Sequence, residues 1–159
     1  MCGNCTNCTN CKTSIWNVCS GATIDHTMID AIDMSHVSQC FLDEYYPIVA
    51  NKGWNKTMHF YAADARICCN SNVYDSCHDF LAAMSGDYVQ RANYQNHQAN
   101  WSPIDHHTAL INVFGEIQLV SFTGLLTGVG HFSDTFVIKA FDTPSGLSYA
   151  VINHSLYIS

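Results

Sequence analysis

The sequence predicts an α+β domain in which a curved antiparallel sheet packs on helices. Two observations lead to this prediction. Apolar residues recur at helical spacing in the first half of the chain, and after Gly86 apolar and polar residues alternate with a period of two. Helices followed by a run of strands favour an arrangement in which the helices cover one face of an antiparallel sheet.

The composition restricts the possible classes of function. The chain has 159 residues, of which 48% are hydrophobic and 12% charged, and its net charge is −7. Binding to a nucleic-acid backbone requires clustered cations, and the six Lys and Arg residues form no basic run. We therefore expect no direct contact with nucleic acid. No apolar stretch approaches the ~20 residues that a membrane-spanning helix needs.

Residues 1–24 are rich in Cys, Asn, Thr, Ser and Gly, and we interpret them as a flexible tail ahead of a folded domain at 25–159. The N-terminus lacks the basic and apolar segments of a secretory signal, and the nine cysteines are an odd number. Both features favour a reducing compartment, the cytosol or the nucleus. Four cysteines have apolar neighbours, as small core residues would: Cys40, Cys68, Cys69 and Cys77.

The first half of the folded domain predicts helices. The segment 24–46 is amphipathic, Asp25 can cap its start, and Pro47 should stop or kink it because proline lacks the amide hydrogen. A short helix through Tyr61 and a strand at 65–69 are expected next. A second amphipathic helix is predicted over 72–84, with Gly86 ending it.

The second half predicts a meander of long strands, at 87–102, 108–120, 131–141 and 147–158. Pro144 and Gly146 favour a turn, so the last two strands should form a hairpin. We expect the preceding connection, residues 121–130, to be flexible. Most strands carry apolar or neutral residues on both faces, as expected if one face packs on helices and the other on a partner.

Four segments, in this order, resemble the nuclear transport factor 2-like family: FLDEYY (41–46), HFY (59–61), FSDTFVI (132–138) and GLSYAVINHSLYI (146–158). The resemblance spans about residues 25–159 and implies a cone-shaped curved sheet. It is nearest to the branches of the mRNA export factors and of the Ras-GAP SH3-domain-binding proteins of stress granules. The family's C-terminal Asn-Asp pattern becomes Asn153-His154 here, and segment 121–130 lacks the carboxylates with which the import branch holds Ran-GDP.

The resemblance implies a non-enzymatic transport adaptor, in the nucleus and at the nuclear pore and shuttling with the cytoplasm, without a cofactor. Such domains bind Phe-Gly or Phe-rich peptides in an aromatic slot, which by position comprises Phe41, Phe60 and Phe132, with Tyr45 beside them. The alternative is that these rings are core residues. The open sheet face is the family's dimerisation surface, for a second copy or an mRNA export receptor. Other functions within the fold are a cytoplasmic stress-granule scaffold and a Ran-GDP import factor.

The row of thiols at Cys2, Cys5, Cys8 and Cys11 is a weak candidate for a metal site. Structural zinc sites pair two Cys-x2-Cys arms that lie a dozen or more residues apart, and this row has no second arm. An iron–sulfur run would place its fourth Cys one residue later, before proline. Reversible acylation of the tail is another possibility, and an uncommitted tail is the interpretation we favour.

The rival class of function is a small isomerase or dehydratase of the same fold, which needs an Asp/His pair for acid–base chemistry. The sequence offers three groups of neighbouring candidates: His59 with Asp64, His78 with Asp79, and Asp105 with His106 and His107. Because adjacent residues on a strand point to opposite faces, Asp105 and His106 cannot share one pocket if that segment is extended.

Overall fold

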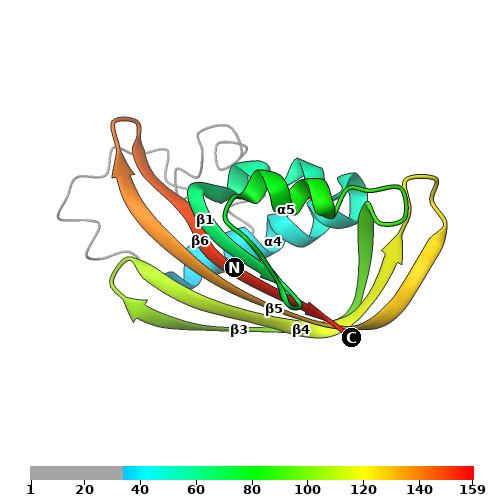
Figure 1. The fold of residues 1–159 in the computed structure, drawn as a ribbon. Helices are drawn as coiled ribbons and strands as arrows, with labels where there is room; N and C mark the ends of the chain where they lie inside the picture. The colour runs from blue at the N-terminus through cyan, green and yellow to red at the C-terminus, as the bar shows by residue number, and fades with distance from the viewer. Residues whose placement is uncertain (1–33) are drawn as a thin grey trace.

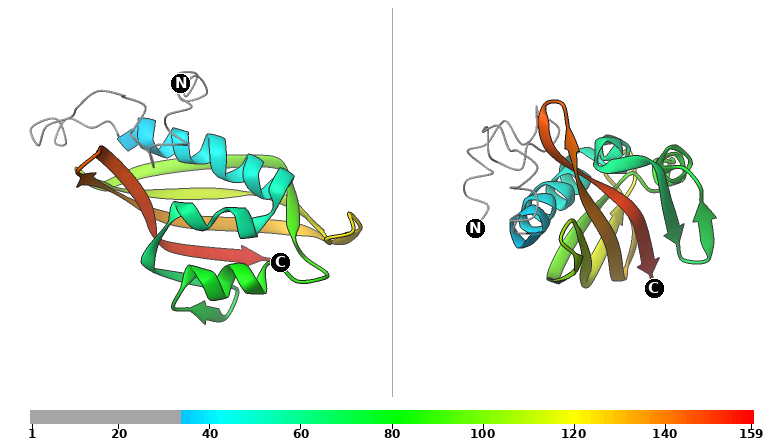
Figure 2. Two further views of the ribbon diagram at one scale, coloured as in Figure 1. Left: turned by 90° about the horizontal axis from the view of Figure 1, so that it is seen from above. Right: turned by 90° about the vertical axis from the view of Figure 1, so that its left-hand side faces the viewer.

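The computed structural model describes residues 34–159, so the predicted tail, its thiol row and the expected start of the first helix lie outside the described residues. The described part contains a six-stranded sheet and helices packed on one side of it (Figure 1). The sheet bends around the helices, and both α-helices cover the same face (Figure 2). This arrangement confirms the predicted α+β class and the curved sheet.

Helix α4 (Met34–Lys52) is the longest helix of the described residues. Its buried side chains recur at helical spacing, including Val37, Phe41 and Tyr45, which confirms an amphipathic helix at these positions. Pro47 was predicted to stop or kink the helix; it does not stop it, because the helix continues to Lys52. Pro47 lies on the exposed side, while the buried Tyr46 and Val49 hold both flanks against the sheet.

Gly53 ends helix α4. Its backbone has a φ of +97°, a conformation that favours glycine. A Cβ at this position would also lie 2.8 Å from the carbonyl oxygen of Gln90. The amide of Trp54 donates to that same oxygen at 3.2 Å. The end of the helix is therefore tied to the residue before strand β3 (Arg91–Asp105).

The segment between the helices differs from the prediction. The expected short helix consists of two 3-10 turns, η1 (Trp54–Lys56) and η2 (Met58–Phe60), and strand β1 (Tyr61–Cys69) begins earlier than expected. A short strand β2 (Asn72–Tyr74) precedes helix α5 (Cys77–Ala83), so only the second half of the predicted helix is helical. Ser76 caps α5 by accepting from the amide of Asp79, which explains why the helix starts there.

The long strands agree closely with the predicted meander. They are β3 (Arg91–Asp105), β4 (Thr108–Val120), β5 (Leu126–Thr143) and β6 (Gly146–Ile158). The order in the sheet is β2-β1-β6-β5-β4-β3, with β1 and β6 parallel and every other neighbouring pair antiparallel. The β5–β6 hairpin forms as predicted, pairing Thr143 with Gly146 at its turn.

Strand β6 contains an irregularity that matters for the site. Val137 of β5 pairs with Asn153, but the next residue, Ile138, pairs with Val151, so Ile152 is left over. An extra residue of this kind shifts the alternation of side chains between the two faces. Tyr149 and Val151 face the helices before it, and His154 and Leu156 do so after it.

The cysteines are less uniformly buried than predicted. Cys77 is buried as a small core residue with a free thiol. Cys40 is also buried but is disulfide-bonded, and Cys68 and Cys69 on strand β1 are only half-buried. Strand β1 lies between β2 and β6 near the edge of the sheet. No helix of the described residues is long and apolar enough to cross a membrane.

Candidate functional site

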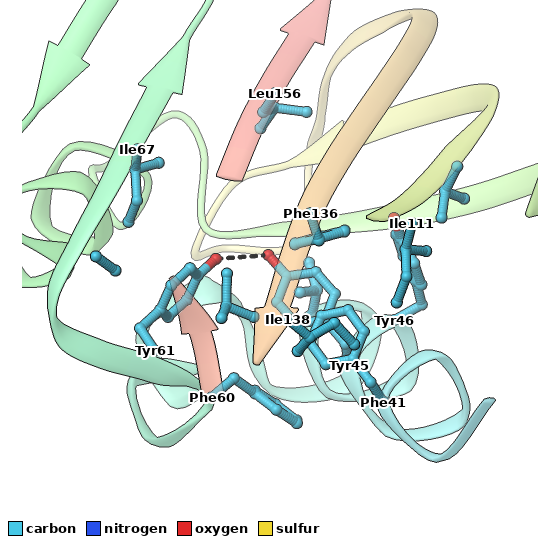
Figure 3. Close-up of a cluster of buried hydrophobic side chains, with 14 of the residues drawn as sticks. Phe41, Tyr45, Tyr46, Phe60, Tyr61, Ile67, Ile111, Phe136, Ile138 and Leu156 are labelled. Carbon is cyan, nitrogen blue, oxygen red and sulfur yellow. Dashed lines mark hydrogen bonds between the residues drawn. The ribbon is translucent and has the colours of Figure 1, made fainter. Parts of the chain in front are cut away.

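The predicted peptide-binding rings lie inside the domain, and Figure 3 labels Phe41, Tyr45 and Phe60 among the buried side chains. Phe41 and Phe60 have no exposed surface, Tyr45 has none, and Phe132 is 3% exposed. Phe41 contacts Phe60 edge to face, with ring centroids 5.4 Å apart, and lies 5.1 Å from Tyr45. Such ring pairs stabilise a core by about 0.5–1.5 kcal/mol each beyond the area buried.

Phe132 belongs to a different part of the same core. Its ring lies 4.9 Å from Tyr94 and 6.1 Å from Tyr46, on the side of helix α4 that faces strand β3. In this conformation none of the proposed slot residues offers a face to a peptide. A Phe-binding slot at these positions would require the core to open, and the binding role stays a prediction.

A chain of hydrogen-bonded side chains runs through the core between helix α4 and the sheet. Asp134 lies at its centre: Tyr46 donates to Oδ2 at 2.7 Å, and Nε2 of His154 is 2.7 Å from Oδ1. The other ring nitrogen of His154, Nδ1, is 2.9 Å from the hydroxyl of Tyr61. That hydroxyl is 3.2 Å from the hydroxyl of Tyr45, the contact drawn as a dashed line in Figure 3.

The donors and acceptors of this chain form a consistent set. An ionised carboxylate only accepts, so His154 donates to Asp134 through Nε2. Nδ1 of the neutral imidazole then accepts from Tyr61, and Tyr61 accepts from Tyr45 in turn. Every side-chain donor of the chain thereby has an acceptor, as buried polar groups require.

The surroundings of this chain are aromatic and closed. Asp134 is 2% exposed and His154 not at all. The imidazole of His154 stacks on Phe136 with ring centroids 4.1 Å apart, and its centroid lies 5.9 Å from that of the Tyr61 ring. A polar chain so enclosed depends on its own partners rather than on water, so losing one member leaves another unsatisfied.

Burial raises the pKa of the hydroxyls of Tyr45, Tyr46, Tyr61 and Tyr94 above the ordinary value for tyrosine, with the nearby Asp134 carboxylate adding to the effect. The folded protein therefore holds protons on these tyrosines that the unfolded chain releases above about pH 10. Their contribution to stability is complete below that pH and is lost as the pH rises beyond it. We predict a steep fall in the free energy of unfolding above about pH 10, by up to ~1.4 kcal/mol per pH unit for each of these tyrosines. Urea denaturation at stepped alkaline pH measures it, and a flat profile to about pH 11 would contradict it.

The acid–base candidates chosen from sequence lie on the surface. The side chains of His59, Asp64, His78, Asp79, Asp105 and His106 are exposed, and that of His107 is intermediate. Asp105 uses its carboxylate to accept from the backbone amide of His107 at 2.8 Å, which closes the β3–β4 turn.

The acid–base pair that sequence reasoning missed is Asp134 with His154. The signal for Asp134 was available, because it lies in phase with Phe132 and Phe136 on a strand that buries alternate residues. Strict alternation from Tyr149 and Val151 would have placed Asn153, not His154, inside. The irregularity at Ile152 reverses that expectation.

The outer face of the sheet, which we define as the outward residues of β3–β6 between the levels of Leu110 and Phe114, is uncharged. Paired residues form three rows across it: Ser102–Leu110–Val137–Asn153, Asn100–Asn112–Thr135–Ser155 and Gln98–Phe114–Ser133–Tyr157. Phe114 is 44% exposed and Tyr157 59%. Thr135 donates to Asn112 at 2.9 Å within the central row. The face therefore offers aromatic and neutral side chains to a partner.

Among residues 34–159 no group of three or more His, Cys, Asp or Glu side chains could hold a metal ion. The candidate ligands Cys2, Cys5, Cys8 and Cys11 lie outside this range. A metal site in the tail stays a prediction.

No protein-family model and no curated protein matches the chain. Solved structures do. Nuclear transport factor 2 from Cryptosporidium parvum is 12% identical with a TM-score of 0.58, covering 87% of this chain and 100% of its own. The chain has a nuclear transport factor 2-like fold.

Proteins of different function share this fold. The yeast UBP3-associated protein BRE5 matches with a TM-score of 0.55 and 17% identity, over 80% of this chain and 98% of its own. The beta subunit of the benzoate 1,2-dioxygenase from Burkholderia mallei matches with a TM-score of 0.58 and 13% identity, over 80% and 91%. At these identities the likeness shows the nuclear transport factor 2-like fold alone, so function must be argued from the chain's own surfaces.

Proposed function

We propose that this nuclear transport factor 2-like domain is a non-enzymatic interaction domain that pairs, through the outer face of its sheet, with a second domain. The observation that carries the proposal is the uncharged outer face, with Phe114 on β4 and Tyr157 on β6 exposed on either side of Ser133 of β5. A chain with a net charge of −7 has charges for its surface, yet none of them lies in these three rows. Depletion of charge together with exposed aromatic residues is typical of the core of an interface.

The test is a change of charge on that face. Phe114→Asp combined with Tyr157→Asp should weaken self-association by roughly 100-fold, because the carboxylates would be desolvated without partners. Analytical ultracentrifugation over a range of concentrations measures this. Val73→Asp, at an exposed position on the edge strand β2, is the matched control and should leave association unchanged.

A wild-type chain that remains monomeric throughout that range would exclude a homodimer. The remaining form of the proposal would then be a heterodimer with a larger receptor. That form is tested by whether the same double variant abolishes co-purification with a receptor that wild type retains. If neither assembly depends on this face, the proposal fails.

The finer form of the proposal is an adaptor in nucleocytoplasmic transport, of the mRNA export or nuclear transport factor type. Its support is the resemblance in the four segments at 41–46, 59–61, 132–138 and 146–158. A fluorescently tagged chain is expected to stain the rim of the nucleus. Diffuse cytoplasmic staining with condensates would instead favour the stress-granule scaffold.

Acid–base catalysis is the second candidate, and the hydrogen-bonded chain Tyr45–Tyr61–His154–Asp134–Tyr46 favours it. A carboxylate that orients an imidazole is a common device for moving protons in enzymes. Here both groups are enclosed by aromatic rings and are bonded to each other and to tyrosines. We favour the interaction function over catalysis because a substrate could reach His154 in this conformation only by displacing Phe136 or Tyr61.

A further inference from the structure

We propose that the free edge of strand β3 pairs with the β3 edge of a second copy of this chain. Strand β3 is the last strand of the sheet, so β4 pairs with only one of its two edges. Figure 1 shows β3 at the border of the sheet, beside β4. A free edge carries backbone donors and acceptors that have no partner in the sheet, and these groups can pair with another chain.

The two edges of the sheet differ in how they are protected against such pairing. Strand β2, at the opposite edge, has only 3 residues, whereas β3 has 15. Two features interrupt the free edge of β3: the register shift between Gln95 and Gln98, and Pro103, which has no amide hydrogen. We call residues 98–102, which lie between these features, the open edge. None of them is charged, although charged side chains are a usual protection of an edge.

The open edge is uncovered on both faces of the sheet. Every residue of 95–105 is exposed. Trp101 pairs with Ile111 of β4, and Ala99 pairs in the same way with Val113. Ile111 and Val113 are fully buried, so Trp101 and Ala99 point to the inward face as well. Trp101 is nevertheless 41% exposed. The cover over the inward face therefore ends between β4 and β3 at this level.

Pro103 indicates which backbone groups of the open edge lack a partner. It pairs with Ala109 in the β3–β4 ladder, and proline fits an edge strand where the missing amide hydrogen would face away from the neighbouring strand. In an antiparallel ladder, successive residues direct their backbone groups alternately to one edge and to the other. The register is unbroken from Gln98 to Pro103. Ala99 and Trp101 therefore direct their N–H and C=O groups to the free edge.

These four backbone groups are complementary to those of a second copy. If two β3 strands lie antiparallel about a two-fold axis at Asn100, Ala99 of each copy lies opposite Trp101 of the other. The amide of each residue then donates to the carbonyl of the residue opposite, which gives two hydrogen bonds in each of the two symmetric pairs. Every backbone group that the open edge leaves free thereby obtains a partner.

The side chains of the open edge fit the same arrangement. On the inward face, the large indole of Trp101 lies opposite the small methyl group of Ala99. On the outward face, Asn100 meets Asn100 of the other copy, and a side-chain amide can both donate and accept. Gln98 lies opposite Ser102, so no like charges meet across the axis. This self-complementarity favours a second copy over a foreign peptide as the occupant.

The edge interface is separate from the interface on the outer face. Phe114 and Tyr157 lie on β4 and β6, whereas the second copy lies beside β3 and prolongs the sheet. The outer face would then continue across both copies, so the two interfaces can form together. A pairing of five residues is short, and small interfaces of this kind are weak. We therefore expect the edge interface to be the weaker of the two.

The first test exchanges charges at the proposed axis in the full chain. Phe114→Asp and Tyr157→Asp are present throughout, so that pairing through the outer face is suppressed and the remaining association is measured. In this parent, Asn100→Lys and Asn100→Asp should each weaken association by about 10-fold or more, because like charges meet at the axis. An equimolar mixture of the two should regain the association of the parent, because lysine then meets aspartate. Analytical ultracentrifugation measures all four samples.

The second test addresses the direction of the backbone groups. Ala99→Pro removes a donor from the free edge, so in the same parent it should weaken association by about 10-fold while the melting temperature is retained. Asn100→Pro is the matched control, because its amide faces β4 and its loss should lower the melting temperature. Amide hydrogen exchange followed by NMR should slow at Ala99 and Trp101 as the parent concentration rises, whereas Asn100 should exchange slowly throughout.

Four results would overturn the proposal, and each leaves the outer-face interface to be judged by its own test. A parent that stays monomeric at every concentration would exclude pairing at the edge. A mixture of the Lys and Asp variants that does not regain association would exclude an axis at Asn100. Slow exchange at Ala99 and Trp101 that does not depend on concentration would mean that a segment of the same chain covers the edge. Slow exchange only after another protein is added would mean that the occupant is a foreign strand.

Discussion

Replacing Asp134 with alanine is expected to lower the free energy of unfolding by about 3–5 kcal/mol, because it removes one partner of a buried hydrogen-bonded pair. Nε2 of His154 and the hydroxyl of Tyr46 both lose their acceptor, at 2.7 Å each, and neither can turn to water. Urea denaturation followed by circular dichroism measures the change. Ser133→Ala, the exposed neighbour on the opposite face, is the matched control and should change stability by less than about 0.5 kcal/mol.

The same pair predicts strong coupling between its two members. With leucine at position 134 the imidazole of His154 lacks an acceptor, whereas a phenylalanine at position 154 needs none. Asp134→Leu combined with His154→Phe should therefore lower the free energy of unfolding by clearly less than the sum of the two single changes. The expected coupling energy is about 1–3 kcal/mol. Additive single and double effects would mean that the two residues act independently, contrary to their 2.7 Å contact.

Replacing Phe41 with alanine is expected to destabilise the domain by about 3–5 kcal/mol through the cavity it leaves. The ring is fully buried and contacts four others, those of Tyr45, Phe60, Phe136 and Tyr149. Phe114→Ala on the outer face, where the ring is half exposed, should cost about 1 kcal/mol or less. The melting temperatures of the two variants provide the comparison.

A second variant separates the core role of Phe41 from the slot role implied by the resemblance. Phe41→Leu nearly conserves the volume and should cost less than about 1.5 kcal/mol, so it remains folded. If Phe41 is a core residue only, Phe41→Leu should have the same affinity for a Phe-Gly repeat peptide as wild type. If wild type shows no binding, the variant should show none either. Loss of peptide binding by a stably folded Phe41→Leu would show that the slot opens in solution.

Local pattern predicted most of the secondary structure. The alternation over 108–120 matches β4 (Thr108–Val120) at both ends, and Pro144 with Gly146 marked the β5–β6 turn. These elements are determined by residues close in sequence: side chains that alternate and a turn that suits proline and glycine. The amphipathic spacing of Val37, Phe41 and Tyr45 likewise identified the core face of α4.

The errors arise where a distant contact outweighs a local preference. Pro47 was expected to stop or kink α4, but the helix continues through it, with buried residues on either side of the proline. The segment 72–74 reads as the start of a helix, yet it pairs with β1 as an edge strand. In both cases the deciding contact is with a distant part of the chain and cannot be deduced from the local segment alone.

The same distinction between local pattern and distant contacts applies to which residues are exposed and which are buried. Sequence alone indicated that strands β4–β6 carry mostly apolar or neutral residues and that residues 121–130 carry no charge, because these are properties of composition and period. It could not determine that Phe41, Phe60 and Phe132 would be covered, since burial depends on how the helices sit on the sheet.

The polar centre of the domain was decided by tertiary structure. The alternation of β5 contains the signal that Asp134 points inward, although the prediction did not include it, whereas the position of His154 depends on the extra residue at Ile152, which reverses the alternation of β6. That irregularity follows from the register of β6 between β5 and β1, and register depends on pairing across the sheet. The physical reason is that side-chain direction along a strand is local, whereas the choice of neighbour in a sheet is not.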